Sequence, residues 1–319
     1  MYEPPFTRTA RMDYLCMEIA EMVGRLTPVS EMSTSPVLHR KLRIQTIHSS
    51  LVVEGNTLTV EQVTAILDGK RVLGNRDDIR EVENADRAYA LLFELDPYLL
   101  SDLLRIHKEM TEGLVPTAGR FRDANAGVFD GGRLIHMGTP AHYVPQVMAD
   151  LFSWLERTEL HPLLSSCIFH YEFEFIHPFA DGNGRTGRLW HTLLLSKWRD
   201  VLAWLPVESV ILRTQQRYYG AFAASESRGD GAPFVEYMLE AIREALEPYC
   251  RMKSDVELRE EALLDFVHEH PEATLARISE HLGVSRATAD RTVASLRASG
   301  RLTREGSKRS GRWIMSDPV

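Results

Sequence analysis

Apolar residues recur at three- and four-residue intervals along most of the chain, which is the spacing of helices that bury one face. Between residues 12 and 26, for example, Leu15, Ile19 and Val23 share a face. The same pattern predicts helices over residues 37–54, 80–95, 98–113, 146–155, 163–175, 189–198, 215–222 and 234–246. Thr59, with Gln62 three positions later, begins another helix with a capping box. We therefore expect a mainly α-helical fold.

The end of the chain has a different order of elements. Helical patterns at residues 258–268, 275–282 and 286–298 are followed by short strands at 301–304 and 312–315. This order is similar to a winged helix-turn-helix domain. We expect an N-terminal helical region at residues 1–95, a core at 96–250 and the winged helix at 251–319.

One further strand pair is expected inside the core. An Asp-Gly pair between apolar residues is typical of a tight β-hairpin turn. The hairpin's residues are Phe129, Asp130, Gly131, Gly132, Arg133 and Leu134.

Composition narrows the class of protein without identifying it. The chain has 319 residues and a net charge of −8, so no global charge attracts it to nucleic acid or to an anionic membrane. Its three cysteines are widely separated and form neither a disulfide framework nor a metal-binding pair. The first residues lack a signal-peptide pattern, and no apolar run is long enough to span a bilayer. We expect a cytoplasmic protein with no membrane partner.

Residues 177–188, between two predicted buried helices, carry most of the candidate chemistry. The first N–H groups of a helix have no internal partner and favour an anion. Gly182, Gly184 and Gly187 allow a ligand to approach these groups closely. The second helix is therefore expected to begin at an anion site.

The charged residues of the same segment suit a nucleoside triphosphate. Arg185 and Arg188 are three positions apart, on one helix face, and two guanidiniums suit the outer phosphates. Asp181 is a candidate ligand for Mg²⁺, and His177 is the nearby group that accepts a proton near neutral pH. Together they indicate transfer of part of a nucleoside triphosphate to a hydroxyl.

The segment resembles the signature of the Fic family, His-Pro-Phe-x-(Asp/Glu)-Gly-Asn-(Gly/Lys)-Arg-x-x-Arg, at every defined position. The resemblance implies transfer of AMP from ATP to a Ser, Thr or Tyr hydroxyl of an unidentified protein, self-modification included. It assigns the general base to His177, Mg²⁺ to Asp181 and the α-phosphate to Asn183. It assigns the rest of the ATP site to Gly182, Gly184, Arg185, Thr186, Gly187 and Arg188.

A second motif lies at the end of the predicted helix 37–54. Ser50 and Glu54 share a face, and Gly55 ends the helix. A carboxylate at a helix C-terminus is unfavourable unless a cation compensates it. The segment is similar to the Fic inhibitory motif, (Ser/Thr)-x-x-x-Glu-(Gly/Asn). The resemblance implies that Glu54 pairs with Arg188, as in the N-terminally inhibited class, while removal of AMP by the same site stays open.

Two further roles have competing interpretations. In the family, a hairpin like residues 129–134 pairs with the target segment by strand addition; the alternative is an ordinary surface hairpin. Tyr218 contacts adenine or ribose, or else belongs to the core.

The winged helix has a local excess of positively charged residues in an otherwise acidic chain. From Thr274 onward there are nine Lys/Arg and four Asp/Glu. DNA-binding candidates are Arg286, Arg291, Lys308, Arg309 and Arg312. Winged helices also dock proteins or form homodimers, so the partner stays open.

Three functions therefore compete. The first is an AMP-transferring enzyme inhibited by Glu54. The second is a Fic-type phosphotransferase, whose members carry Lys at the position of Gly184, so Gly184 favours AMP transfer. The third is an ATP-sensing, DNA-binding transcription regulator.

Overall fold

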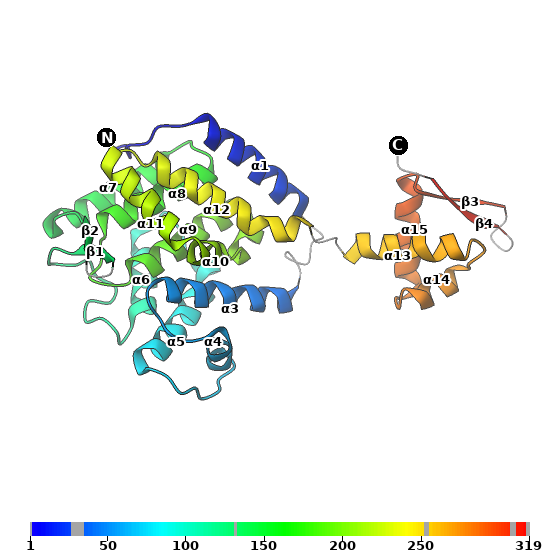
Figure 1. Ribbon diagram of the computed structural model, residues 1–319, viewed down its shortest axis with the longest axis horizontal. Coiled ribbons are helices and arrows are strands. Elements are labelled where there is room, and N and C mark those ends of the chain that lie inside the picture. The colour runs from blue at the N-terminus through cyan, green and yellow to red at the C-terminus, as the bar shows by residue number, and fades with distance from the viewer. Residues whose placement is uncertain (1, 27–34, 131–132, 252–254, 307–310, 317–319) are drawn as a thin grey trace. The chain divides into compact units, whose positions relative to one another are not determined.

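The computed structural model describes residues 2–26, 35–130, 133–251, 255–306 and 311–316, which form two compact units that divide at Cys250 (Figure 1). The larger unit contains α1 (Ala10–Leu26), α3 (Pro36–Val53), α4 (Val60–Leu67), α5 (Arg76–Ala90), α6 (Leu100–Thr111), α7 (Val144–Arg157), α8 (Pro162–Ile176), α9 (Asn183–Trp198), α10 (Val207–Arg213), α11 (Gln215–Arg228) and α12 (Ala232–Arg251). The mainly helical fold is confirmed. None of the described helices is long and apolar enough to cross a membrane.

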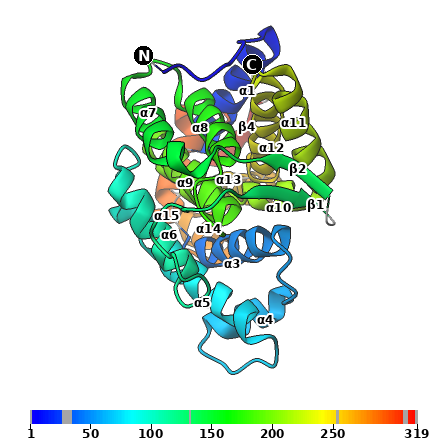
Figure 2. The ribbon, with the colours of Figure 1, turned by 90° about the vertical axis from the view of Figure 1, so that its left-hand side faces the viewer.

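Helices α8 and α9 form the centre of the larger unit. Phe169, Phe173 and Trp190 are 0% exposed, and almost every residue of both helices is buried. A helix that is apolar on all sides is buried by its neighbours. Here α7 packs on α8, while α3 and α6 pack on α9, as the end view in Figure 2 shows. The loop between α8 and α9 is therefore held from several directions.

The bounds of α5 and the presence of α10 differ from the sequence prediction. Helix α5 begins at Arg76, four residues before the predicted start, because Asn75 caps it and Asp77 and Asp78 favour its first turn. That polar turn has no apolar periodicity to reveal it. Helix α10 was not predicted, because it is only 7 residues long and almost wholly buried against α3, which removes the amphipathic pattern.

The predicted hairpin is confirmed. Strands β1 (Gly127–Asp130) and β2 (Arg133–Met137) are antiparallel, with Asp130 opposite Arg133 and a register shift between Val128 and Phe129. Gly131 and Gly132 lie outside the described residues. Leu134 is paired with Phe129 in the backbone register.

The C-terminal unit is a winged helix, as predicted. It contains α13 (Asp255–Glu269), α14 (Leu275–His281), α15 (Arg286–Ala298), and the antiparallel strands β3 (Leu302–Glu305) and β4 (Arg312–Met315). Thr274 and Ser285 cap α14 and α15 with their hydroxyls. Trp313 closes a small core and donates from its indole Nε1 to the Ala273 carbonyl at 2.9 Å.

Candidate active site

The loop begins at His177, which ends α8 in the left-handed backbone region with φ 52°. It is the one non-glycine residue with positive φ in the described ranges. Such a backbone costs of order 1–3 kcal/mol and persists only where its surroundings hold it. Arg122, 4% exposed, does so by donating from Nε to the His177 carbonyl at 2.7 Å and from Nη2 to the Ile176 carbonyl at 3.3 Å.

Gly182 ends the loop and caps α9 in the left-handed region, with φ 80°. A Cβ at this position would lie 2.6 Å from Cγ2 of Thr111 on α6. The glycine is therefore required both by the backbone conformation and by the close approach of α6.

Inside the loop, Asn183 holds the backbone of Phe179. Its Oδ1 accepts from the Phe179 N–H at 2.8 Å, and its Nδ2 donates to the Phe179 carbonyl at 2.9 Å. The side chain is buried, with 2% of the residue exposed. Asn183 therefore shapes the loop by binding the Phe179 backbone on both sides.

His107 on α6 supports the same loop and was not identified from the sequence. Its ring stacks on Phe179, with centroids 3.6 Å apart. Its Nδ1 accepts from the Gly119 N–H at 2.9 Å, so the ring proton lies on Nε2, which is 2.9 Å from the Asp181 carbonyl. Burial lowers the pKa of His107 to about 4, and the ring is neutral near pH 7. The available signal was its position beside Ile106 on the apolar face of α6.

Arg188 is almost wholly buried, with a side chain 2% exposed, and Glu54 neutralises it. Its Nη2 lies 2.9 Å from Glu54 Oε1, and it also donates to the Ser50 carbonyl and Oγ at 2.8 and 3.0 Å. Burial alone would lower the pKa of Arg188, but the Glu54 charge and hydrogen bond, together with nearby Tyr218 and Glu174, raise it overall. The structure thus brings together Ser50, Glu54 and Arg188, which the sequence analysis had grouped. Gly55, with φ 95°, follows them.

Gly184 provides the space for this carboxylate. A Cβ on Gly184 would overlap Glu54 Oε1 and lie 2.9 Å from Arg188 Nη1. The Glu54 carboxylate therefore lies against the first turn of α9, where the sequence predicts an anion.

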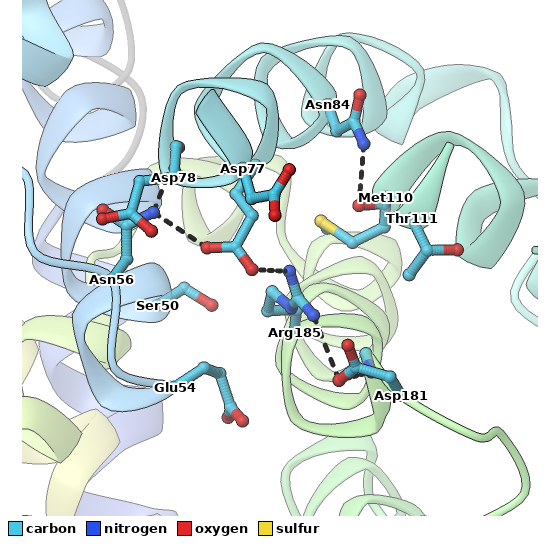
Figure 3. A network of polar contacts seen from close by, with 12 residues as sticks. Ser50, Glu54, Asn56, Asp77, Asp78, Asn84, Met110, Thr111, Asp181 and Arg185 are labelled. Atoms are coloured by element: carbon cyan, nitrogen blue, oxygen red, sulfur yellow. Dashed lines mark hydrogen bonds and ion pairs between the residues drawn. The ribbon is translucent and has the colours of Figure 1, made fainter. Parts of the chain in front are cut away.

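Arg185 is also buried, with a side chain 3% exposed, and bridges two carboxylates (Figure 3). Its Nη1 lies 2.5 Å from Glu81 Oε1 on α5, and its Nη2 lies 3.3 Å from Asp181 Oδ1. Glu81 in turn accepts from Asn56 Nδ2 at 2.8 Å. Glu81 and Asn56 were not identified from the sequence, because neither motif extends to them.

Asp181 is the exposed carboxylate of the loop, with 62% of its side chain accessible. Its Oδ1 accepts from the Gly182 N–H at 2.6 Å, while its Oδ2 makes no hydrogen bond within the described residues. The described part of the chain contains no group of three or more His, Cys, Asp or Glu placed to share a metal ion. A single open carboxylate nevertheless fits Mg²⁺ that takes its other ligands from phosphate and water.

Three residues that the sequence analysis assigned to the ATP site are buried in this structure. Tyr218 is 4% exposed and its hydroxyl is 3.2 Å from His170 Nε2, which favours the alternative that it belongs to the core. Thr186 is 0% exposed. A Cβ on Gly187 would lie 2.7 Å from Glu174 Oε1 on α8, so this glycine allows α8 and α9 to pack closely.

The hairpin lies beside the loop through Gly138, which follows β2. A Cβ on Gly138 would be 3.1 Å from His177 Cβ, and the Thr139 N–H donates to the Ile176 carbonyl at 3.3 Å. The hairpin strands thus end next to the candidate base.

In the C-terminal unit, Arg286 and Arg291 are exposed on α15, and Arg312 is exposed at the start of β4. Lys308 and Arg309 lie outside the described residues.

Comparison with known proteins identifies the family. The Fic/DOC family profile matches residues 94–195, and the MarR family profile matches residues 254–312. The crystal structure of a Fic family protein from Desulfovibrio desulfuricans G20 is 42% identical, covers 99% of this chain and 98% of its own, and superposes with a TM-score of 0.76. The chain belongs to the Fic family.

Curated relatives carry a more specific name. Protein adenylyltransferase Fic of Drosophila grimshawi is 28% identical over 76% of this chain and 49% of its own length. Protein adenylyltransferase fic-1 of Caenorhabditis elegans is 29% identical over 64% of this chain and 40% of its own. The chain spans about half the length of the curated relatives that it matches. A structure of C. elegans Fic-1, 22% identical and covering 75% of this chain and 70% of its own, has a TM-score of 0.57 and shares the fold.

His107 yields a prediction about loop stability. His107→Ala removes the stack on Phe179 and leaves the Gly119 N–H and the Asp181 carbonyl unpaired, so we expect a loss of about 2–4 kcal/mol in unfolding free energy at pH 7. Urea unfolding measures the loss. His142→Ala, at an exposed histidine, is the control and should stay within about 0.5 kcal/mol of wild type.

The same pair of variants tests the depressed pKa of His107. The unfolded ring has a pKa near ~6.5, so the folded protein excludes a proton that the unfolded chain binds as the pH falls from there towards the folded value, about 4. The His107 contribution is complete above the unfolded value and declines below it. The difference in unfolding free energy between wild type and His107→Ala should narrow by about 2 kcal/mol between pH 7 and pH 5. A gap that widens contradicts a neutral buried ring.

Proposed function

We propose that this protein is a protein adenylyltransferase that transfers AMP from ATP to a protein hydroxyl. The observation that carries the proposal is the pair of arginines, Arg185 and Arg188, 3% and 2% exposed on the first turns of α9. Buried cations at a helix N-terminus are suited to a polyphosphate. The curated relatives named protein adenylyltransferase support the same activity.

In the proposed reaction, His177 accepts the proton of the target hydroxyl, and that oxygen forms a bond to the α-phosphorus of ATP. The bond from the α-phosphorus to its bridging oxygen breaks, and pyrophosphate leaves. Arg185 and Arg188 hold the outer phosphates and stabilise the leaving group, and the Gly182 and Gly184 amides face the anion. Asp181 would hold Mg²⁺, which would neutralise charge on the phosphates. Gly184, in place of the lysine of the phosphotransferases, supports AMP transfer over phosphate transfer.

The proposal also covers how the target protein docks and where in the cell this protein is located. Strands β1 and β2, which end beside His177, offer a backbone edge to an extended target segment by strand addition. The target, including the protein itself, is recognised there. A cytoplasmic location is proposed because Cys16, Cys167 and Cys250 form no disulfide in the part of the chain that the structure describes.

We propose further that Glu54 inhibits the enzyme. With its carboxylate on Arg188 and against Gly184, Glu54 occupies space that the outer phosphates require. ATP that reaches the site cannot then use Arg188, so its α-phosphorus is not presented to the hydroxyl.

Glu54→Gly should therefore raise AMP incorporation by about tenfold or more, a barrier change of about 1.4 kcal/mol, because Arg188 becomes available to phosphate. Labelled ATP and mass spectrometry of the modified protein measure the rate and distinguish added AMP from added phosphate. Glu54→Gln, which keeps the size and removes the charge, should also activate. His177→Ala added to Glu54→Gly should abolish incorporation. Equal or lower incorporation by Glu54→Gly than by wild type contradicts inhibition by Glu54.

A second function is favoured by the C-terminal unit. The MarR family match, the α14–α15 helix-turn-helix order and the exposed Arg286 and Arg291 support binding of DNA in the major groove by α15. The ATP site would then act as a sensor, or as an enzyme directed to DNA. Homodimer formation through this unit is the alternative partner mode.

DNA binding by the full chain should weaken steeply with salt, because phosphate contacts release counterions. The double variant Arg286→Ala/Arg291→Ala should lower the slope of log affinity against log salt by about 1–2. Fluorescence anisotropy with a duplex at several salt concentrations measures this. Arg297→Ala, in the last turn of α15, is the matched control. Saturable binding unaffected by the double variant would exclude α15 as the contact.

A further inference from the structure

The two buried arginines of α9 are neutralised from different directions. Arg188 is paired with Glu54, which follows the last turn of α3, whereas Arg185 is paired with Glu81 in the middle of α5. A buried guanidinium that loses its carboxylate is left as an uncompensated buried charge, which is strongly destabilising. Glu81 is therefore the group that allows Arg185 to be buried in the first turn of α9 without a phosphate.

Glu81 is itself fixed at both oxygens. Oε1 accepts from Arg185 at 2.5 Å, and Oε2 accepts from Asn56 Nδ2 at 2.8 Å. Asn56 is 7% exposed, and its own Oδ1 accepts from the Leu58 N–H at 3.1 Å. A series of hydrogen bonds thus runs from Asn56 through Glu81 to Arg185, and it restricts the rotation of all three side chains (Figure 3).

Hydrogen bonds also join helix α5 to the protein core next to Glu81. Asn84, one turn after Glu81, donates from Nδ2 to the Met110 carbonyl at 3.3 Å (Figure 3) and to the Glu112 carbonyl at 2.9 Å. These bonds join α5 to the end of α6, the helix that also supplies His107. The carboxylate of Glu81 is thus presented from a rigid element, as a positioning group requires.

The two carboxylates leave their arginines in different states. Arg188 uses Nη2 and Nε on Glu54 and Ser50. Arg185 uses Nη1 and Nη2, and its buried Nε makes no hydrogen bond with any residue that the structure describes. A guanidinium whose Nη1 and Nη2 each donate to a carboxylate still has other N–H groups that can donate to a phosphate.

We propose that Glu81 is a positioning residue for ATP: it holds Arg185 in the orientation that receives a phosphate, in contrast to Glu54, which occupies Arg188. The proposal rests on the proposed adenylyltransferase function. It extends the nucleotide site to α5, outside residues 94–195 that match the Fic/DOC profile. It also assigns Asn56 to the site, because Asn56 orients Glu81.

Calorimetry with Mg²⁺ and ATP tests the proposal in a Glu54→Gly/His177→Ala parent, which binds without turnover. Adding Glu81→Ala should weaken ATP binding by about tenfold, since Arg185 loses its fixed orientation. Glu81→Gln should lie between the parent and Glu81→Ala, because its amide oxygen still accepts from Arg185. Glu83→Ala is the matched control: Glu83 is exposed on the same helix, and its side chain makes no hydrogen bond with the described residues.

Kinetics in the Glu54→Gly protein provide a second readout. Glu81→Ala and Glu81→Gln should raise KM for ATP more than they lower kcat, and melting temperatures identify any variant that loses its fold. If Glu81→Ala does not fold, Glu81→Gln alone decides. Unchanged ATP affinity in Glu81→Gln, with the parent binding ATP, overturns the proposal. Tighter binding also overturns it and makes Glu81 a second inhibitory carboxylate. A parent that binds no ATP overturns the proposed function itself.

Discussion

Two guanidiniums buried at the N-terminus of α9 are the constraint on which the rest of the site depends. Each is about as buried as a core side chain, yet each keeps its charge, and an unpaired buried charge costs several kcal/mol. An anion beside each guanidinium therefore stabilises the folded protein. The structure supplies these anions from its N-terminal helices, Glu81 from α5 and Glu54 from the end of α3. Helices α3 and α5 lie in the same compact unit as the central helices, where these carboxylates reach the arginines.

The loop before α9 is shaped by groups that carry no charge at pH 7 or that bind only backbone. Asn183 and His107 hold Phe179, and Arg122 holds the carbonyls at the end of α8. These contacts hold His177 in a left-handed conformation that a non-glycine residue rarely adopts, whereas the left-handed Gly182 is favoured by glycine itself. The backbone amides and the imidazole are thereby placed before any substrate arrives, which is the condition for electrostatic preorganisation.

The sequence predicted the parts of the site that lie within short motifs, and missed the parts that tertiary packing brings in. His177, Arg188 and Glu54 follow from spacing and from the Fic resemblance. Glu81 lay within the predicted helix 80–95, but it was not identified as a site residue, because its partner Arg185 is over a hundred residues away and no motif links the two. His107 lay within a predicted helix, but a lone histidine on an apolar face is usually a core residue. Asn183 and Tyr218 show the opposite limit: a motif identifies the residues, whereas burial decides what their side chains contact.

The proposed inhibitory role of Glu54 is consistent with the stabilisation that an anion gives to Arg188. A tethered carboxylate has an effective concentration of roughly millimolar order, so it competes with a free nucleotide although it carries a single charge. Glu54 extends from the residue that ends α3, and its side chain is 34% exposed, whereas Glu81 lies in the middle of a helix and is 20% exposed. A small displacement of the end of α3 would remove Glu54 from Arg188 without disturbing Glu81 on Arg185. The phosphates of a nucleotide could then replace the Glu54 carboxylate at Arg188, while Arg185 stays paired with Glu81. At most one of the two buried arginines would be unpaired during this exchange.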